Sequence, residues 1–541
     1  MADNRVDAIV PTLSGRQNSD SSLRSSSDLE RKELKLRTDD EKQPSSHEHA
    51  AYGEEDADVT ASVVAPVAMP WRYKWLALLV IVLLPIGNTW ADSSMSPLKA
   101  TLRRELKISN TDYGVIDSAG NIVNSVWPII GGLALDWYGV NLGLLACTGV
   151  IFVGACLSAI ACNISNWRLM AGGKILQGFG DAVLDSAQRK LLYHYFGSKG
   201  LAFAGGLELS VYRAISLIAG STAVPISEGT GWYGWAFWIP AMWCLVSVMI
   251  TIGYVIFDAK FVPKSIRLTS NKAAAKLARD HVAKKRFNLS AYWLLPWAFW
   301  MLPSTMVMQS AAAGAFGGIS PDLIRMKGYT EAVAAFTANA RQLIPLFLLP
   351  FVGLGIDRFG HRFHLIAFAP LLWILSYSLI GFTSVHPLVP VVFVSFCNLI
   401  QAFPIQATIP LLVRDQTKLG TAFGVYRAFN NAGSAIMDVV IGRLQDSTED
   451  MAYTKVLYLV ISLKALAFVL GLGYLFADFK YLGRGMTMSE RARVEQESQI
   501  ENPEDDPLTR RTVSKVWTWY GTGILFAMVV TGWVIFIYYL L

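Results

Sequence analysis

The sequence predicts an all-α membrane protein with many transmembrane helices, and three observations lead to this fold class. Of the 541 residues 53% are hydrophobic and only 16% are charged, whereas soluble domains carry about 25% charged residues. The mean hydropathy is +0.38. Apolar stretches of about 20 residues, the length needed to cross the hydrocarbon core of a bilayer, recur along most of the chain.

These stretches fall into two groups of six, followed by one more at the end of the chain. The grouping predicts an N-terminal six-helix bundle over residues 69–257, a C-terminal six-helix bundle over 291–480 and an extra transmembrane helix over 516–541. The stretches lie near 72–94, 112–135, 141–162, 166–195, 200–225, 233–257, 291–316, 331–356, 363–383, 388–412, 420–444, 453–477 and 516–541.

The segments between the bundles predict the orientation in the membrane. Residues 258–290 form a basic linker, which is typical of the cytosolic side. The polar residues 1–68 then form a disordered cytosolic tail, and 481–515 is also cytosolic. The C-terminus lies on the non-cytosolic side, after a helix that either anchors the chain or binds a partner membrane helix. Four basic residues between Lys99 and Lys107 fall on the non-cytosolic side and do not fit this pattern.

A loop motif occurs twice, at an offset of about 220 residues, which indicates an internal repeat. Each copy is expected at the cytosolic end of the second helix of its bundle. Its residues are Gly132, Asp136 and Gly139 in the first copy, and Gly353, Asp357, Arg358, Gly360 and Arg362 in the second.

The motif resembles the loop signature of the major facilitator superfamily, and the resemblance covers about residues 72–480. It implies the major facilitator fold, with alternating access by two rocking bundles. The glycines would permit a tight turn, the aspartates would cap or pair at a helix end, and the basic residues would brace a gate. The first copy lacks the basic residues and has Trp137 and Asn141 instead.

Charged residues inside the predicted spans indicate a polar cavity, because a charge at mid-bilayer costs about 2.5–3.5 kcal/mol on insertion scales. Asp181 and Arg213 each lie about 16 residues from the turn near Gly197, so both rise ~24 Å along the hairpin and reach the same depth. We expect both to face the central cavity, either paired or flanking the substrate. The other candidate substrate-binding residues are Arg341, Arg427, Asn121, Gln401 and Asn430.

The sequences around Asp181, Arg213 and residues 419–433 resemble the lysosomal dipeptide uniporter branch of the superfamily. The resemblance implies that Asp181 faces a peptide amine and Arg213 a peptide carboxylate. Asp181 is shorter than the usual Glu of that branch, and Arg341, Arg427 and Asp438 replace uncharged residues. The extra cations favour a more anionic solute or a different pairing scheme. The expected function is a symporter or uniporter for a dipeptide-like zwitterion or an organic anion, in the plasma membrane or a vacuolar or lysosome-like membrane.

Other functions remain open or are disfavoured. Copper transport is one alternative, because thioethers bind Cu(I) and Met301 and Met308, seven residues apart in one predicted helix, share a face. A nutrient sensor with a transporter fold is another. The sequence has no P-loop, metalloprotease or nucleophile motif, so we expect no enzyme activity and no cofactor. The net charge of +6 over this length gives no support for nucleic-acid binding.

Overall fold

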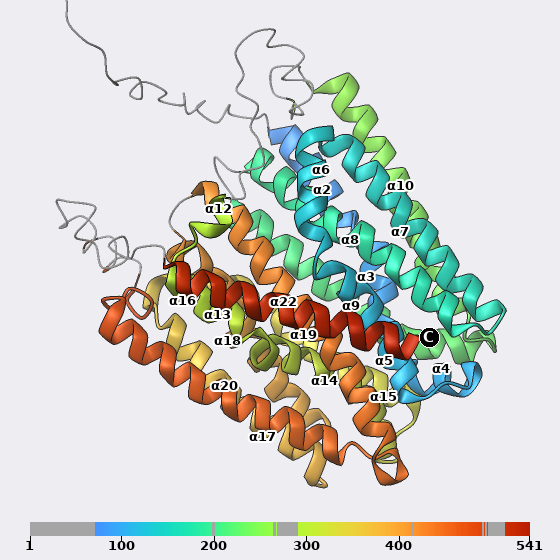
Figure 1. The fold of residues 1–541 in the computed structure, drawn as a ribbon. Helices are drawn as coiled ribbons and strands as arrows, with labels where there is room; N and C mark the ends of the chain where they lie inside the picture. Colours follow the sequence, from blue (N-terminus) through green and yellow to red (C-terminus); the bar gives the residue numbers. More distant parts are fainter. Residues whose placement is uncertain are drawn as a thin grey trace, which may run out of the picture. The chain divides into compact units, whose positions relative to one another are not determined.

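The structure is a computed structural model, which describes residues 71–196, 201–262, 267, 290–413, 416–489, 492, 495 and 514–540. Within these ranges every regular element is a helix (Figure 1). They belong to one compact unit, Ala65–Leu541. The tail 1–68, most of the linker 258–290 and most of the segment 481–515 lie outside the described residues.

The helices agree closely with the predicted spans, although several spans are divided. The N-terminal helices are α2 (Trp71–Leu83), α3 (Ile86–Ser93), α4 (Lys99–Leu106), α5 (Asn110–Asn124), α6 (Trp127–Tyr138), α7 (Val140–Asn163), α8 (Trp167–Phe196), α9 (Leu201–Thr230) and α10 (Trp235–Phe261). The C-terminal helices are α12 (Ser290–Trp293), α13 (Trp297–Ser304), η1 (Val307–Ala311), α14 (Ala312–Met326), α15 (Glu331–Asn339), η2 (Ala340–Gln342), α16 (Leu343–Phe359), α17 (Arg362–Phe382), α18 (Leu388–Leu412), α19 (Gln416–Asp446), η3 (Glu449–Met451), α20 (Thr454–Tyr481) and α22 (Lys515–Leu540).

The divided spans break at positions with a local cause. Pro85 lies between α2 and α3, where its ring disfavours a continuous helix. A π-helical turn, η1, follows the end of α13, and a 3₁₀ turn, η2, separates α15 from α16. Such turns release backbone groups from regular pairing and reorient the side chains that follow. Helix α5 begins with a capping box in which Ser109 and Asp112 satisfy each other's backbone N–H groups.

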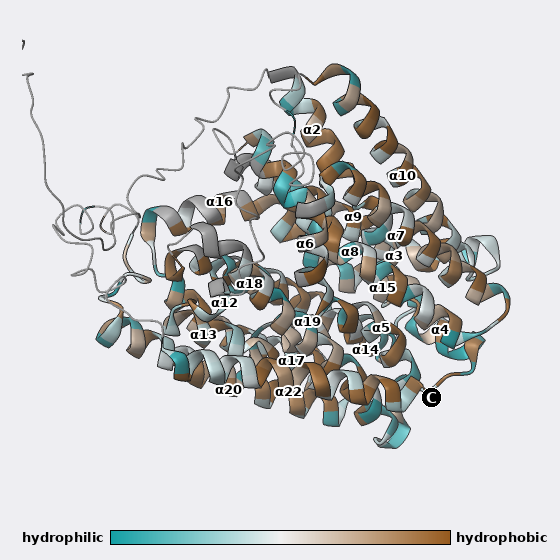
Figure 2. Ribbon diagram, turned by 45° about the horizontal axis from the view of Figure 1, so that its top comes forward, coloured by the Kyte–Doolittle hydropathy of each residue, from teal (hydrophilic) through white to brown (hydrophobic). Residues whose placement is uncertain are grey.

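Nine described helical segments are long and apolar enough to cross a membrane. They include α7, α10, α17, α20 and α22, and Figure 2 shows the hydrophobic character of α10 along its length. The four remaining predicted spans correspond to α5–α6, α8, α13–α14 and α19. These four are interrupted or contain several charged residues, which are the features expected of helices that line a polar interior.

The N-terminal and C-terminal helices meet along two seams, one between α5 and α19 and the other between α9 and α15–α16. At the first seam the backbones approach very closely. A Cβ atom added at Gly114 would clash with the backbone carbonyl of Asp438, and one added at Gly442 would clash with the carbonyl of Asn110. Small residues permit this approach between membrane helices.

The last helix, α22, packs against both sets of helices. It contacts α13 and α19 of the C-terminal set and α5 of the N-terminal set, and Figure 1 shows it running across these helices. Near its start, Gly521 lies against the ring of Trp300, and further along Gly532 lies next to Ile122 and Ile436. The extra helix therefore covers the α5–α19 seam from outside.

We expect Gly521→Ala to destabilise the protein, because the added methyl group would clash with the Trp300 ring. Overpacking of this kind costs about 1–3 kcal/mol. Gly523→Ala is the matched control, since a Cβ atom there meets nothing within 4 Å. Thermal unfolding of the two variants in one detergent should show a lower midpoint for Gly521→Ala alone. Equal midpoints would mean that α22 does not pack on Trp300.

Candidate functional site

Two arginines from opposite sets of helices approach each other between the bundles and form a cluster of like charges. Arg213 comes from α9, and Arg341 comes from the 3₁₀ turn η2. Arg213 Nη1 donates to Gln342 Oε1 at 2.9 Å, and Arg341 Nη1 lies 3.5 Å from the Ser320 hydroxyl. The absent side chain of Gly317 gives Arg341 room, since a Cβ atom there would lie 2.9 Å from its Nη2 atom.

No carboxylate among the described residues neutralises the charges of this arginine cluster (Arg213 and Arg341). Among the described residues, the ion pairs include neither arginine. The two guanidinium groups lie near enough for their charges to interact unfavourably, and Arg213 Nε is buried without a hydrogen-bond partner in the described part of the chain. Because uncompensated buried charges are costly, this cluster is suited to bind an anionic group such as a carboxylate.

Asp181 on α8 lies in an amide-rich environment formed at the breaks in the first two spans. Its carboxylate accepts hydrogen bonds from Asn88 Nδ2 at 2.8 Å and from Asn124 Nδ2 at 3.3 Å. Asn88 lies in α3, just after the break at Pro85, and Asn124 is the last residue of α5. The amides stabilise the carboxylate without neutralising its charge, so Asp181 can still attract a cationic group.

Two arrangements of Asp181 and Arg213 were predicted: they form an ion pair, or they flank a substrate. The structure excludes the ion pair. They do not form an ion pair, because each has a neutral amide as its partner. The hydroxyl group of Tyr212, the residue next to Arg213, interacts electrostatically with both of them. The arrangement that remains is one in which the two charges are separated.

The other predicted binding residues lie apart from one another, each in its own surroundings. Asn121 Nδ2 donates to Asp438 Oδ2 at 3.0 Å, across the α5–α19 seam. Arg427 Nη1 forms an ion pair with Asp185 Oδ2 at 2.6 Å, and so connects α19 to α8. Asn430 is partly buried on α19.

Gln401 has a different environment. Its amide bonds to Gln309 in the π-helical turn, and the buried ammonium of Lys464 donates to the Gln309 carbonyl at 2.6 Å. These three residues belong to the C-terminal helices alone. Lys464 does not extend toward the membrane surface, because it is 0% exposed and contacts the Gln309 carbonyl in the π-helical turn.

The repeated loop motif adopts related backbone conformations in its two copies. Gly139, between α6 and α7, has φ of +95°, and Gly360, between α16 and α17, has φ of +74°. Both values favour glycine. In the second copy Arg358 is exposed and Arg362 is buried. The side chains of Gly132, Asp136, Gly353 and Asp357 lie outside the described ones, so their gating role stays a prediction.

The copper alternative finds no support in the geometry of the methionines. It required Met301 and Met308 to lie on one face of a continuous helix. The α-helix ends at Ser304, and Met308 belongs to the π-helical turn η1. A separation of seven residues therefore no longer places the two thioethers on one face.

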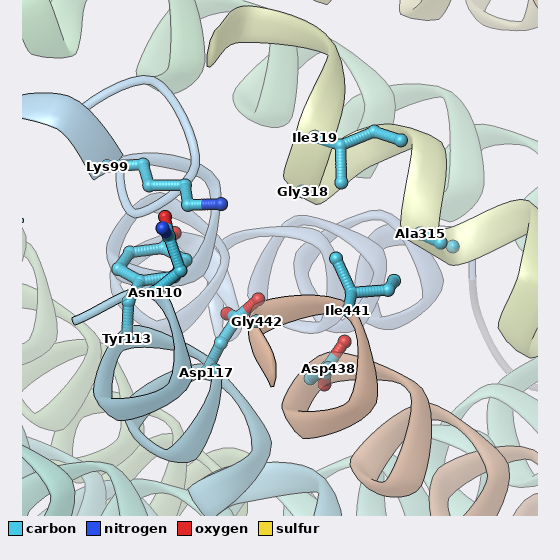
Figure 3. Close-up of a pocket in the computed structure, with 12 residues that line it drawn as sticks. Lys99, Asn110, Tyr113, Asp117, Ala315, Gly318, Ile319, Asp438, Ile441 and Gly442 are labelled. Atoms are coloured by element: carbon cyan, nitrogen blue, oxygen red, sulfur yellow. The ribbon is translucent and has the colours of Figure 1, made fainter. Parts of the chain in front are cut away.

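A small pocket lies where α4, α5, α14 and α19 meet, at the end of the bundle that we call the α4 end. Its polar side chains are those of Lys99, Asn110, Tyr113, Asp117 and Asp438, which Figure 3 shows around one cavity. Burial lowers the pKa of Lys99 to about 8, and its ammonium donates to Gln445 Oε1 at 2.8 Å and to the Tyr453 hydroxyl at 2.9 Å. Lys99 is one of the four basic residues that did not fit the predicted orientation. Its bonds within this buried network explain why a basic residue occurs on the predicted non-cytosolic side.

Further bonds join the two sets of helices at the α4 end. The Asp446 carboxylate, at the end of α19, accepts from the backbone N–H groups of Asn110 and Thr111 at 3.1 and 2.8 Å. Thr101 donates to Glu331 at 2.9 Å. The α4 end is therefore closed in this conformation.

Sequence reasoning missed Asn88, Asp117 and Gln342. Asp117 falls inside the predicted span 112–135. Asp181 was selected because it is a charged residue inside a predicted span, and the same criterion would have selected Asp117. No comparable signal marks Asn88 or Gln342, because amides are also common in ordinary helix–helix contacts.

Comparison with known proteins agrees with this architecture. A sequence profile of the Major Facilitator Superfamily matches residues 79–437. The chain belongs to this superfamily. It is therefore a multi-pass membrane transporter of a small solute rather than an enzyme, and the predicted superfamily and fold class are confirmed.

Individual relatives indicate which branch of the superfamily this chain resembles. The lysosomal dipeptide transporter MFSD1 of Homo sapiens is 22% identical over 463 residues, which cover 82% of this chain and 96% of the relative. The Danio rerio protein of the same name is 23% identical over 459 residues, with the same coverage. These similarities confirm the predicted resemblance to the dipeptide transporter branch.

Solved structures share the fold at low sequence identity. The nucleoside transporter NupG matches with a TM-score of 0.54 and 14% identity, over 75% of this chain and 99% of NupG. A D-xylose-proton symporter matches with a TM-score of 0.58 and 11% identity, over 74% of this chain and 97% of the symporter.

Proposed function

We propose that this transporter carries a small solute with a free carboxylate group, of the dipeptide type, by alternating access. The observation that carries the proposal is the arginine cluster, in which Arg213 and Arg341 converge from opposite bundles without a carboxylate partner among the described residues. A solute carboxylate would supply the missing negative charge and would connect the two bundles through one ligand.

Asp181 supports the dipeptide class within this proposal. Its carboxylate accepts hydrogen bonds from two neutral amides, and among the described residues it has no ion-pair partner. A zwitterion has one group of each sign, so its amine would face Asp181 while its carboxylate faces the arginine cluster. The similarity to MFSD1, a lysosomal dipeptide transporter by name, favours the same class and a lysosome-like membrane.

The Asp185–Arg427 ion pair fits a gate in such a carrier. It connects α8 to α19, and we place it on the cytosolic side, where the predicted orientation puts the turn between α8 and α9. The closed α4 end would then face the lumen or the cell exterior. Movement of the solute would require the contacts at the two ends to open alternately.

The test is uptake of a radiolabelled dipeptide into liposomes that contain the purified protein. The matched control is the same dipeptide with its C-terminal carboxylate converted to a carboxamide. We expect the amidated peptide to be taken up at least about 30-fold more slowly, because leaving a buried charge unpaired costs 2–5 kcal/mol. Equal uptake of both peptides would contradict a role for the arginines in carboxylate recognition. Specific binding without uptake would favour a sensor.

A further inference from the structure

The pocket at the α4 end contains two acidic side chains from opposite bundles. Asp117 extends from α5 and Asp438 from α19, and both line the same cavity (Figure 3). Among the described residues neither carboxylate takes part in an ion pair. The Asn121 amide donates to Asp438 at 3.0 Å, but a neutral amide does not neutralise a carboxylate.

Two further residues that line the pocket each carry a buried oxygen atom that is not used among the described residues. The hydroxyl group of Tyr113, whose residue is 4% exposed, has no hydrogen-bond partner within that part of the chain. The side-chain carbonyl Oδ1 of Asn110, whose residue is 0% exposed, also lacks one there. Buried polar atoms are normally satisfied in native structures, so two unsatisfied ones beside one cavity indicate a missing ligand.

The nearby basic groups are already engaged elsewhere. The Lys99 ammonium bonds to Gln445 and to Tyr453, and the Tyr453 hydroxyl donates to Asp322 at 2.7 Å. Asp117 and Asp438 interact with each other, and Lys174, Asp92 and Lys99 also act on Asp117. Lys174 forms an ion pair with Asp92 at 2.7 Å. The charged side chains that line the pocket are therefore two acidic ones and Lys99.

The size of the pocket limits what can occupy it. Its cavity holds about 50 Å³, whereas one water needs about 10–15 Å³ on such a measure. A few waters or one small ion fit, but a dipeptide does not. All the unused ligand atoms are oxygens, which hard cations prefer.

We propose that this pocket binds one small monovalent cation, a proton or a sodium ion, between Asp117 and Asp438. The two carboxylates face one cavity because the α4 end is closed. Without a cation, their repulsion opposes closure, and a bound cation removes that repulsion. Cation binding therefore favours the conformation in which the α4 end is closed. The proposal does not depend on which solute is carried, and it extends beyond the arginine cluster.

The experiment measures closure of the α4 end directly. Spin labels replace the exposed Arg104 on α4 and the exposed Lys455 at the start of α20. The distance between the labels is measured by pulsed electron resonance in lipid nanodiscs. It is compared at neutral and mildly acidic pH, and in sodium chloride and choline chloride.

We expect the cation to shift the population toward the shorter distance by about 5- to 150-fold, the usual range of such couplings. A shift with acid alone identifies the proton, and a shift with sodium alone identifies the metal ion. A distance distribution that changes with neither would overturn the proposal.

The variants assign the effect to the pocket. The double substitution Asp117→Asn with Asp438→Asn removes both charges but keeps the side-chain size, so the α4 end should stay closed in every condition. Asp117→Asn alone should reduce the response, and it serves if the double variant does not fold. Glu105→Gln, an exposed change on α4 outside the pocket, should leave the response intact. A full response in the double variant would mean that another group binds the cation.

Discussion

Arg341→Gln is expected to reduce dipeptide uptake by at least about 30-fold, because it removes one of the two positive charges that face the solute carboxylate. Breaking a desolvated charge pair costs 2–5 kcal/mol, and about 1.4 kcal/mol corresponds to a factor of ten. The effect should appear with Arg213→Gln as well, since both guanidinium groups belong to the same cluster. Initial uptake rates in liposomes, normalised to folded protein, measure it.

Two controls separate recognition from general damage. Arg443→Gln makes the same change at an exposed position of α19 and should leave uptake near the wild-type rate. Arg213→Lys retains the charge but loses the planar fork that binds a carboxylate bidentately, so its uptake should be intermediate. Normal uptake by both glutamine variants would show that the solute binds elsewhere.

The second large effect is expected from Gly442→Ala at the α5–α19 seam. The added methyl group would clash with the backbone carbonyl of Asn110, and a backbone cannot move away as a flexible side chain can. The α4 end should then close less readily. A cost of about 1–3 kcal/mol for such overpacking corresponds to a shift of about 5- to 150-fold in the closing equilibrium.

Gly424→Ala is the matched control on the same helix, because a Cβ atom there meets nothing within 4 Å. The distance between labels at positions 104 and 455 should lengthen in Gly442→Ala and remain unchanged in Gly424→Ala. The rate of uptake should fall in the first variant only. Wild-type distances in Gly442→Ala would show that this contact does not limit closure.

The sequence was sufficient for the order and the approximate ends of the helices. The predicted spans 141–162, 363–383 and 388–412 correspond to α7, α17 and α18 within a few residues. A membrane span needs a fixed number of apolar residues, so hydropathy alone locates it. The repeated loop motif was also correctly placed at helix ends, where Gly139 and Gly360 have positive φ values.

The partners of the buried charges required the tertiary structure. Counting residues from a turn gives the depth of Asp181 and Arg213 at ~1.5 Å per residue, but it does not give the direction in which each side chain points. That direction depends on the breaks at Pro85 and at the 3₁₀ turn η2, which bring Asn88 to Asp181 and place Gln342 beside Arg213.

The sequence by itself thus determined a repeated, all-helical membrane transporter with ionised groups in its interior. Only the tertiary structure decided that the arginines from the two bundles converge while Asp117 and Asp438 share a separate pocket. The physical reason is that hydropathy and helix length are properties of a segment, whereas the pairing of charges depends on how kinked helices distant in sequence pack together.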